Sequence, residues 1–118
     1  MIRVYVDMVA DLFHTGHINF LKQSKNKGDY LIVGIHSDKD VASYKRMPVI
    51  DENNRCKMVK SCRYVDEVIR DAPLVITEEF IKKNKIDFVV HGDDINNKFM
   101  DFYKVPMKMG IMKYVPYT

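Results

Sequence analysis

Hydrophobic and polar positions alternate between short strand-like runs and longer amphipathic runs along the whole chain. Apolar runs of the kind that form buried strands lie at residues 2–6, 30–36, 65–69, 87–91 and 112–115. The run Tyr-Leu-Ile-Val-Gly-Ile-His at 30–36 is apolar almost throughout, which is typical of a central parallel strand that is covered on both faces. The pattern therefore predicts five strands.

The segments between these runs carry helix signals. Helices are predicted at residues 16–26, 38–44, 52–62, 78–84 and 102–109. Ser37 and Thr77 are suited to cap the second and fourth of them, and Gly28 and Gly110 follow the ends of the first and last. Strands that alternate with helices predict a Rossmann-like α/β fold, in which a five-stranded parallel sheet carries helices on both faces.

The chain has the length of one domain, which we place over residues 1–118. No internal repeat, low-complexity tract or linker interrupts it. The fingerprint Gly-x-Gly-x-x-Gly of dinucleotide-binding folds is absent, and the loop after the first strand carries histidines where a glycine cradle would stand.

Two histidines stand where the first strand gives way to the first helix, in Asp11-Leu12-Phe13-His14-Thr15-Gly16-His17. The N-terminus of a helix favours phosphate, and imidazoles there can donate hydrogen bonds to charge that develops on a phosphoryl group. By itself His-x-Gly-His is a weak motif, equally compatible with a structural helix start. A zinc site is disfavoured because Cys56 and Cys62 are spaced like helix residues, and we predict no protein-bound metal.

Composition narrows the class of partner. The formal charge of +3 suits a small anionic ligand but falls short of the dense basic surface of a nucleic-acid binder. No run approaches the length of a transmembrane helix and no signal peptide precedes the first strand, so we expect no stable membrane attachment. We expect the two cysteines to be free thiols in a reducing compartment. This expectation favours a cytoplasmic location.

Several further motifs occur in a fixed order. After His-Thr-Gly-His come Gly-Asp-Tyr-Leu-Ile-Val-Gly-Ile-His-Ser-Asp, a lysine before Pro-Val, Arg55, Cys-Arg-Tyr-Val-Asp-Glu-Val-Ile, Ala-Pro, Thr-Glu-Glu-Phe and Asp-Phe-Val-Val-His-Gly-Asp-Asp. This set resembles the cytidylyltransferases, and above all the phosphoethanolamine and phosphocholine enzymes. The resemblance covers nearly the whole chain, which makes it far more specific than the histidine motif alone.

The resemblance implies a reaction. CTP and a phosphorylated alcohol would give a CDP-alcohol and pyrophosphate, with Mg²⁺ accompanying the nucleotide. The acceptor phosphate would attack the α-phosphorus directly and in line, so the protein would supply positioning and charge stabilisation. The family also implies a homodimer, formed through the region Arg63–Val68.

The resemblance also implies roles for individual residues. His14, His17 and Lys45 would be catalytic. Asp7, Lys45 and Arg63 would bind the substrate. The nucleotide would contact Val9, Ala10, His14, His17, His91, Gly92 and Asp94.

For three other residues near the motifs, the expected roles are less specific. Arg55 is expected to be positional or to face phosphate, although arginines on or near a helix, such as Arg55 and Arg63, more often pair at the surface with Asp66, Glu67 or Glu52. His36 is expected to be structural, and Asp11 to hold histidine or backbone donors at the first turn.

The chain departs from the family pattern at three places. Met8 and Ala10 stand where relatives have a glycine and an aromatic residue, and we expect a Met at a position of positive φ to change the local backbone. Tyr117 stands where an arginine is expected, and the family's Gly-Ile-Ser-Thr segment is missing, from which we expect weak CTP binding.

The third departure concerns the acceptor alcohol. Asp7 matches a carboxylate that faces the substrate ammonium in the choline and ethanolamine enzymes. A quaternary ammonium also needs an aromatic cage, whereas Leu74 and the Asn96–Asn97 region occupy two aromatic positions of the choline enzymes. This favours phosphoethanolamine over phosphocholine. Glycerol 3-phosphate as acceptor, ATP in place of CTP, and a non-catalytic nucleotide-binding dimer module remain alternatives.

Overall fold

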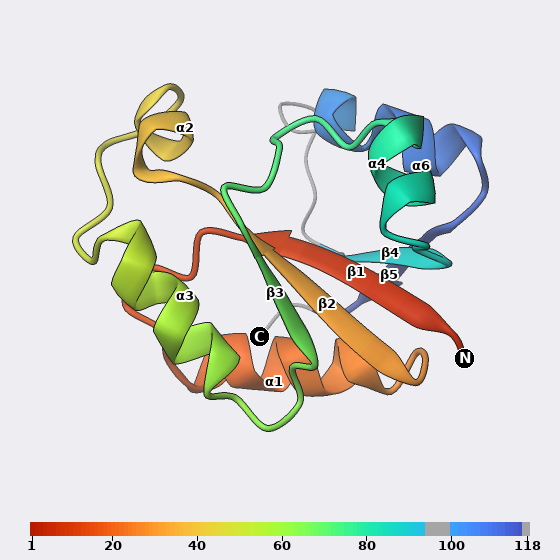
Figure 1. Ribbon diagram of the computed structural model, residues 1–118, viewed down its shortest axis with the longest axis horizontal. Helices are drawn as coiled ribbons and strands as arrows, with labels where there is room; N and C mark the ends of the chain where they lie inside the picture. Colours follow the sequence, from red (N-terminus) through yellow and green to blue (C-terminus); the bar gives the residue numbers. More distant parts are fainter. Residues whose placement is uncertain (94–99, 117–118) are drawn as a thin grey trace.

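Five parallel strands form one sheet in the order β3-β2-β1-β4-β5 (Figure 1). The computed structural model describes residues 1–93 and 100–116. The strands are β1 Arg3–Met8, β2 Tyr30–Ile35, β3 Glu67–Arg70, β4 Phe88–Gly92 and β5 Met112–Val115. Every paired strand is parallel to its neighbour, so all the described strands end at the same edge of the sheet.

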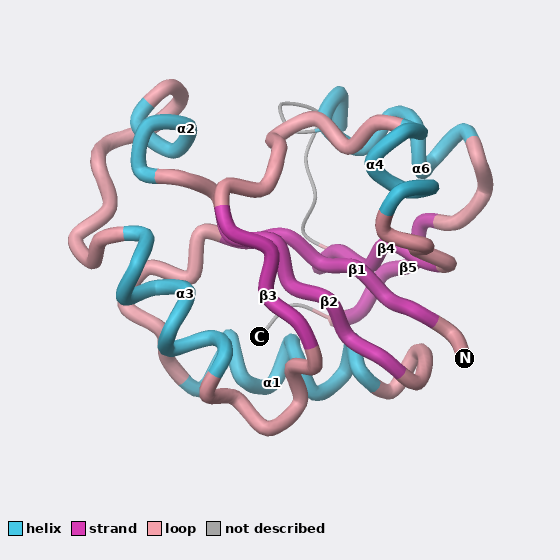
Figure 2. The backbone as a smooth tube through the Cα atoms, viewed as in Figure 1, coloured by secondary structure: helices cyan, strands magenta, loops and turns pink. Residues whose placement is uncertain are grey.

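Helices cover both faces of the sheet, as Figures 1 and 2 show. They are α1 Thr15–Lys25, α2 Asp38–Ala42, α3 Glu52–Lys60, α4 Glu78–Lys83, the 3₁₀ turn η1 Asp101–Tyr103 and α6 Lys104–Lys108. The predicted Rossmann-like fold is confirmed. Within the described ranges, no helix has the length and apolar character needed to cross a bilayer.

The helix caps predicted from the sequence are present. The Ser37 side chain accepts a hydrogen bond from the Asp40 amide, and the Thr77 side chain accepts one from the Phe80 amide. These bonds satisfy amide groups in the first turn that have no partner within the helix, which is the usual role of Ser and Thr at this position.

Two predicted elements differ in the structure. The helix predicted at 102–109 is divided into η1 and α6, because Pro106 has no amide hydrogen to donate to the Phe102 carbonyl, which instead accepts from the Ile76 amide. The strand predicted at 65–69 begins only at Glu67, because the Val65 amide closes a turn onto the Cys62 carbonyl.

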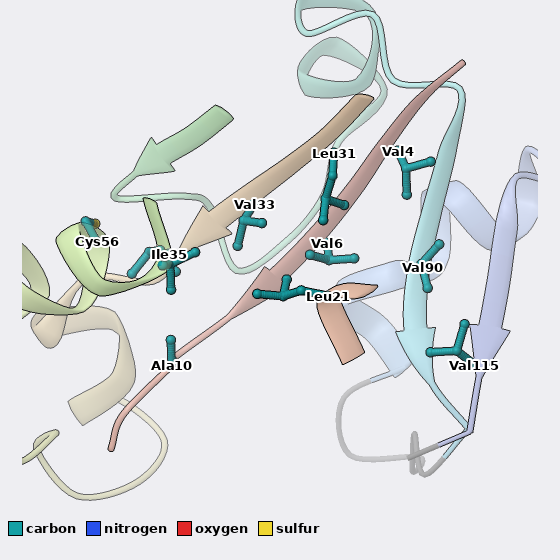
Figure 3. Close-up of a cluster of buried hydrophobic side chains, with 11 residues drawn as sticks. Val4, Val6, Ala10, Leu21, Leu31, Val33, Ile35, Cys56, Val90 and Val115 are labelled. Atoms are coloured by element: carbon teal, nitrogen blue, oxygen red, sulfur yellow. The ribbon is translucent and has the colours of Figure 1, made fainter. Parts of the chain in front are cut away.

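The sheet separates two hydrophobic cores, and β1 contributes to both. Val4 and Val6 point into the core beneath α1 and α3, where Leu21 and Val59 pack; Figure 3 shows most of this cluster. Tyr5 points the other way, into the core beneath α4 and η1. Because side chains alternate along a strand, Asp7 shares the face of Tyr5. Its carboxylate therefore lies on the α4 and η1 side of the sheet, near the carboxyl end of β1.

Tyr5 is packed so closely against β2 that Gly34, two residues beyond its strand partner Ile32, cannot carry a side chain. Tyr5 is completely buried, and its hydroxyl has no hydrogen-bond partner among the described residues. A Cβ atom added to Gly34 would overlap this hydroxyl and would lie 2.7 Å from the Cβ of Ala72. Gly34 therefore makes room for the tyrosine ring in the middle of the sheet.

We predict that Gly34→Ala lowers the free energy of unfolding by about 2–3 kcal/mol, because the added methyl overpacks the core. Tyr5→Phe alone is expected to be neutral or stabilising, since the lost hydroxyl makes no hydrogen bond to any described residue. In the Tyr5→Phe background Gly34→Ala should cost at least about 1 kcal/mol less than in the wild type. Urea unfolding of the four proteins measures this coupling, and strictly additive effects would contradict the proposed clash.

Candidate active site

A cavity of about 370 Å³ opens at the carboxyl ends of β1 and β4. The chain leaves β1 toward β2 on one side, while β4 lies on the other side, so this is the point where the strand order reverses. Ligands of open α/β sheets bind at such a crevice. The residues lining it are Asp7, Met8, Val9, Ala10, Asp11, His14, Gly16, His17, Phe20, Lys45, His91 and Gly92.

The two motif histidines cap α1 through their ring nitrogens. His14 is the N-cap residue, and its Nδ1 accepts a hydrogen bond from the Gly16 amide at 3.0 Å. The Nδ1 of His17 accepts from the His14 amide at 3.1 Å, which completes a capping box. A nitrogen that accepts a backbone bond carries no proton, so in both neutral rings the proton is on Nε2. Each ring therefore has an Nε2–H donor left for a ligand.

The surroundings of His17 favour its neutral form. The Phe13 ring is stacked against the His17 ring with centroids 5.3 Å apart, and the His14 ring lies 4.2 Å away. Burial and, to a lesser degree, the neighbouring His14 lower the pKa of His17 below its usual value. His17 is thus held as a hydrogen-bond donor without a net charge at neutral pH.

Asp11, in the loop that carries the histidines, forms hydrogen bonds to the loop that carries Lys45. Its two carboxylate oxygens accept hydrogen bonds from the Val49 and Ile50 amides, each at 2.9 Å. These backbone bonds lower the pKa of Asp11. The expectation that Asp11 holds backbone donors is confirmed, but the donors come from the loop before α3 and lie outside the first turn of α1.

The strained backbone of this loop lies next to Asp11. Ala10 and Leu12 have φ values of 57° and 50°. Met8, by contrast, is the last residue of β1 and pairs with Ile35 of β2. Met8 therefore does not adopt a positive φ, because the strand continues through that position and the chain turns only after it. Whether the backbone here differs from that of the relatives stays a prediction.

Arg55 is completely buried and joins four segments around the cavity. Its guanidinium donates to the carbonyls of Val9 at 2.6 Å, His36 at 2.9 Å and Ile50 at 2.9 Å, and to the Asp38 carboxylate at 2.7 Å. The alternatives of a surface ion pair and of a phosphate contact were both wrong. The positional role is supported, because these bonds set the distance between the ends of β1 and β2.

A second polar group lies at the base of the cavity, around Asp7. The Asp7 side chain is only 1% exposed. Its Oδ1 accepts from the Tyr103 hydroxyl at 2.6 Å, and its Oδ2 lies 3.3 Å from Nε2 of His36. Burial and Asp7 raise the pKa of Tyr103 far above its usual value, so this hydroxyl keeps its proton and remains a donor. The cavity is thus lined by a buried carboxylate and by histidine and lysine donors.

The structure brings most of the predicted site residues together. Asp7, Val9, Ala10, His14, His17, Lys45, His91 and Gly92 all line the cavity. Asp94 lies outside the described residues, as do Asn96, Asn97 and Tyr117. Tyr103, which contacts both Asp7 and the His91 ring, was missed. Only its place in an amphipathic segment after the fourth strand marked it in the sequence.

Arg63 is the one predicted substrate residue that the structure places elsewhere. It is exposed in a separate surface groove, donates to the Tyr64 hydroxyl at 2.9 Å and lies over that ring. The reason is the direction of α3, which begins next to the cavity at Arg55 and runs back toward the amino ends of the strands. In the single chain Arg63 therefore does not reach the cavity.

Within residues 1–93 and 100–116, no group of three or more His, Cys, Asp or Glu side chains is arranged to hold a metal ion. The two carboxylates at the cavity, Asp7 and Asp11, already accept two hydrogen bonds each. A divalent cation here would thus depend on oxygen ligands that a substrate brings.

Comparison with known proteins identifies the family. Residues 8–115 match the family described as cytidylyltransferase-like. This chain belongs to the cytidylyltransferase-like family. A probable ethanolamine-phosphate cytidylyltransferase of Encephalitozoon cuniculi is 43% identical over 98% of the chain and 37% of its own length. The ethanolamine-phosphate cytidylyltransferase of Dictyostelium discoideum is 42% identical over 99% of the chain and 33% of its own length.

Two further similarities support this assignment. The human choline-phosphate cytidylyltransferase A is 49% identical over 78% of the chain and 26% of its own length. The crystal structure of a lipopolysaccharide core biosynthesis protein from Thermoplasma volcanium has a TM-score of 0.80 and 30% identity, and the match covers 100% of this chain and 97% of that one. The chain spans about a third of the length of the ethanolamine-phosphate relatives.

We predict that Arg55→Lys lowers the free energy of unfolding of this cytidylyltransferase-like domain by about 2–4 kcal/mol, because one ammonium cannot replace a guanidinium that serves three carbonyls and a carboxylate. Arg46→Lys, at an exposed position in the preceding loop, is the control and should change stability by no more than about 0.5 kcal/mol. Thermal and urea unfolding measure both variants. A loss below about 1 kcal/mol for Arg55→Lys would contradict the role assigned to this side chain.

Proposed function

We propose that this domain transfers CMP from CTP to phosphoethanolamine, giving CDP-ethanolamine and pyrophosphate. The observation that carries the proposal is a single cavity whose lining combines phosphate-binding groups, namely His14, His17 and Lys45, with the buried carboxylate of Asp7. The names of the ethanolamine-phosphate relatives, at 42–43% identity, support the same reaction.

The triphosphate would bind at the N-terminus of α1. Helix amides, the Nε2–H groups of His14 and His17, and the exposed Lys45 ammonium all favour negative charge there. In the reaction a phosphate oxygen of the acceptor forms a bond to the α-phosphorus of CTP. The bond from that phosphorus to the bridging oxygen breaks, and its electron pair leaves with pyrophosphate. The histidine and lysine donors would stabilise the charge that gathers on these oxygens.

The acceptor would bind with its ammonium at Asp7. A primary ammonium has three N–H donors, and the ionised Asp7 carboxylate has acceptor capacity beyond the bonds that it already makes. Glycerol 3-phosphate has no positive charge to offer this buried carboxylate. A quaternary ammonium has no N–H donor and depends on an aromatic cage. The site therefore favours phosphoethanolamine over both alternatives.

Mg²⁺ would enter with CTP, held chiefly by the phosphate oxygens and by water. This fits the described residues, which form no carboxylate cage, and it is the usual way in which proteins bind Mg²⁺ with nucleotides. When bound, the ion neutralises phosphate charge, and the residues of the chain orient the phosphates around it.

We also propose that the domain acts as a homodimer in the cytoplasm. The groove that contains Arg63 is lined by Phe13, Ile18, Met58 and Tyr64, and it adjoins the region Arg63–Val68 that the family resemblance implies as the interface. Free Cys56 and Cys62 suit a reducing compartment.

We predict that His14→Asn separates the structural role of His14 from its chemical role. Asparagine is a good N-cap residue, so stability should change by no more than about 0.5 kcal/mol, whereas the Nε2–H donor is lost. Pyrophosphate release with CTP, Mg²⁺ and phosphoethanolamine should fall by about 100- to 1,000-fold. Ser37→Asn, which exchanges the N-cap of α2, is the control and should keep wild-type turnover. Undiminished turnover in His14→Asn would overturn the proposed role.

A further inference from the structure

One buried contact behind the cavity has no role in the chemistry described above. Asp7 lines the cavity, and His36 lies behind it, away from the lining. The His36 residue is 6% exposed, and its Nε2 is 3.3 Å from Oδ2 of Asp7. Its Nδ1 is buried and has no hydrogen-bond partner among the described residues.

These contacts assign the proton on His36. The Asp7 carboxylate accepts, so Nε2 is the donor in this contact. A second proton on Nδ1 would bury an N–H that has no partner among the described residues, which is costly in a protein interior. The geometry therefore favours the ring with a single proton, on Nε2, and in that state the pair Asp7–His36 keeps the negative charge of the carboxylate.

The geometry also shows how Asp7 is held. Tyr103 donates to Oδ1 and His36 donates to Oδ2, so the two carboxylate oxygens are fixed from two sides by uncharged donors. The backbone holds His36 in turn, because its amide donates to the Met8 carbonyl and its own carbonyl accepts from Arg55. An arginine or lysine in place of His36 would fix Asp7 equally well but would cancel the charge that attracts an ammonium.

We propose that His36 is a positioning residue that sets specificity for a primary ammonium in the acceptor. It orients the Asp7 carboxylate and leaves its charge unneutralised. This inference rests on the proposed function, because it assigns the cavity end at Asp7 to the amine of a phosphorylated amino alcohol. It concerns the choice of acceptor and leaves CTP binding unaffected.

The test compares two ligands that share a phosphate and differ in the ammonium. Calorimetry or ligand-observed NMR gives dissociation constants of phosphoethanolamine and glycerol 3-phosphate for the wild type, His36→Leu and His36→Gln. We expect the preference for phosphoethanolamine to fall by about tenfold in His36→Leu, because Asp7 loses one of its two donors. In His36→Gln the side-chain amide can replace Nε2–H as donor, so the preference should return to within about threefold of the wild type. CTP affinity should stay within about twofold throughout.

His36→Leu is the loss variant, because it removes the donor to Asp7. If it does not fold, His36→Asn takes its place, since the shorter side chain cannot bring its amide to Oδ2. Near-UV circular dichroism checks the fold of each protein. An unchanged preference in the loss variant, or a wild type without preference for the amine, overturns the inference. A preference that is reduced in the loss variant and retained in His36→Gln supports the inference. This holds even if the domain releases no pyrophosphate, because that result contradicts only the proposed transfer reaction.

Discussion

The need to satisfy backbone carbonyls at the carboxyl ends of β1 and β2 determines how this site is built. Val9 and His36 directly follow the two strands, and their carbonyls need donors where water is excluded. Arg55 supplies them from a fully buried position, with bonds to Val9 and His36. The same side chain reaches the loop before α3 and the first turn of α2. The elements that line the cavity are therefore held to one another through one guanidinium.

The chemistry of the site depends on which ring nitrogen of each histidine forms a hydrogen bond within the fold. The backbone occupies Nδ1 of His14 and His17, so both rings present Nε2–H to the cavity. Asp7, in contrast, contacts the Nε2 of His36, so that ring is a donor inside the protein. The imidazoles thus supply hydrogen-bond donors through Nε2, and Lys45 is the cation that the described part of the chain places at the cavity.

The sequence predicts the fold well because the pattern of apolar runs and caps is local. The five strands and the caps at Ser37 and Thr77 follow from it. Most of the residues that line the cavity were implied instead by the resemblance of the ordered motifs to a known family. The errors involve contacts between distant segments. The burial of Arg55, the Tyr103 bond to Asp7 and the displacement of Arg63 from the cavity each depend on how elements pack, which no local pattern encodes. The positive φ values at Ala10 and Leu12 likewise reflect the loop as a whole.

The most direct test of this account is the initial rate of pyrophosphate release with Mg²⁺, measured for CTP and for ATP against phosphoethanolamine, phosphocholine and glycerol 3-phosphate. The account predicts turnover with CTP and phosphoethanolamine, at a rate at least about tenfold above every other combination, since one charge-assisted hydrogen bond separates the acceptors. Equal rates for the three acceptors, a preference for ATP, or no release with any pair would contradict it.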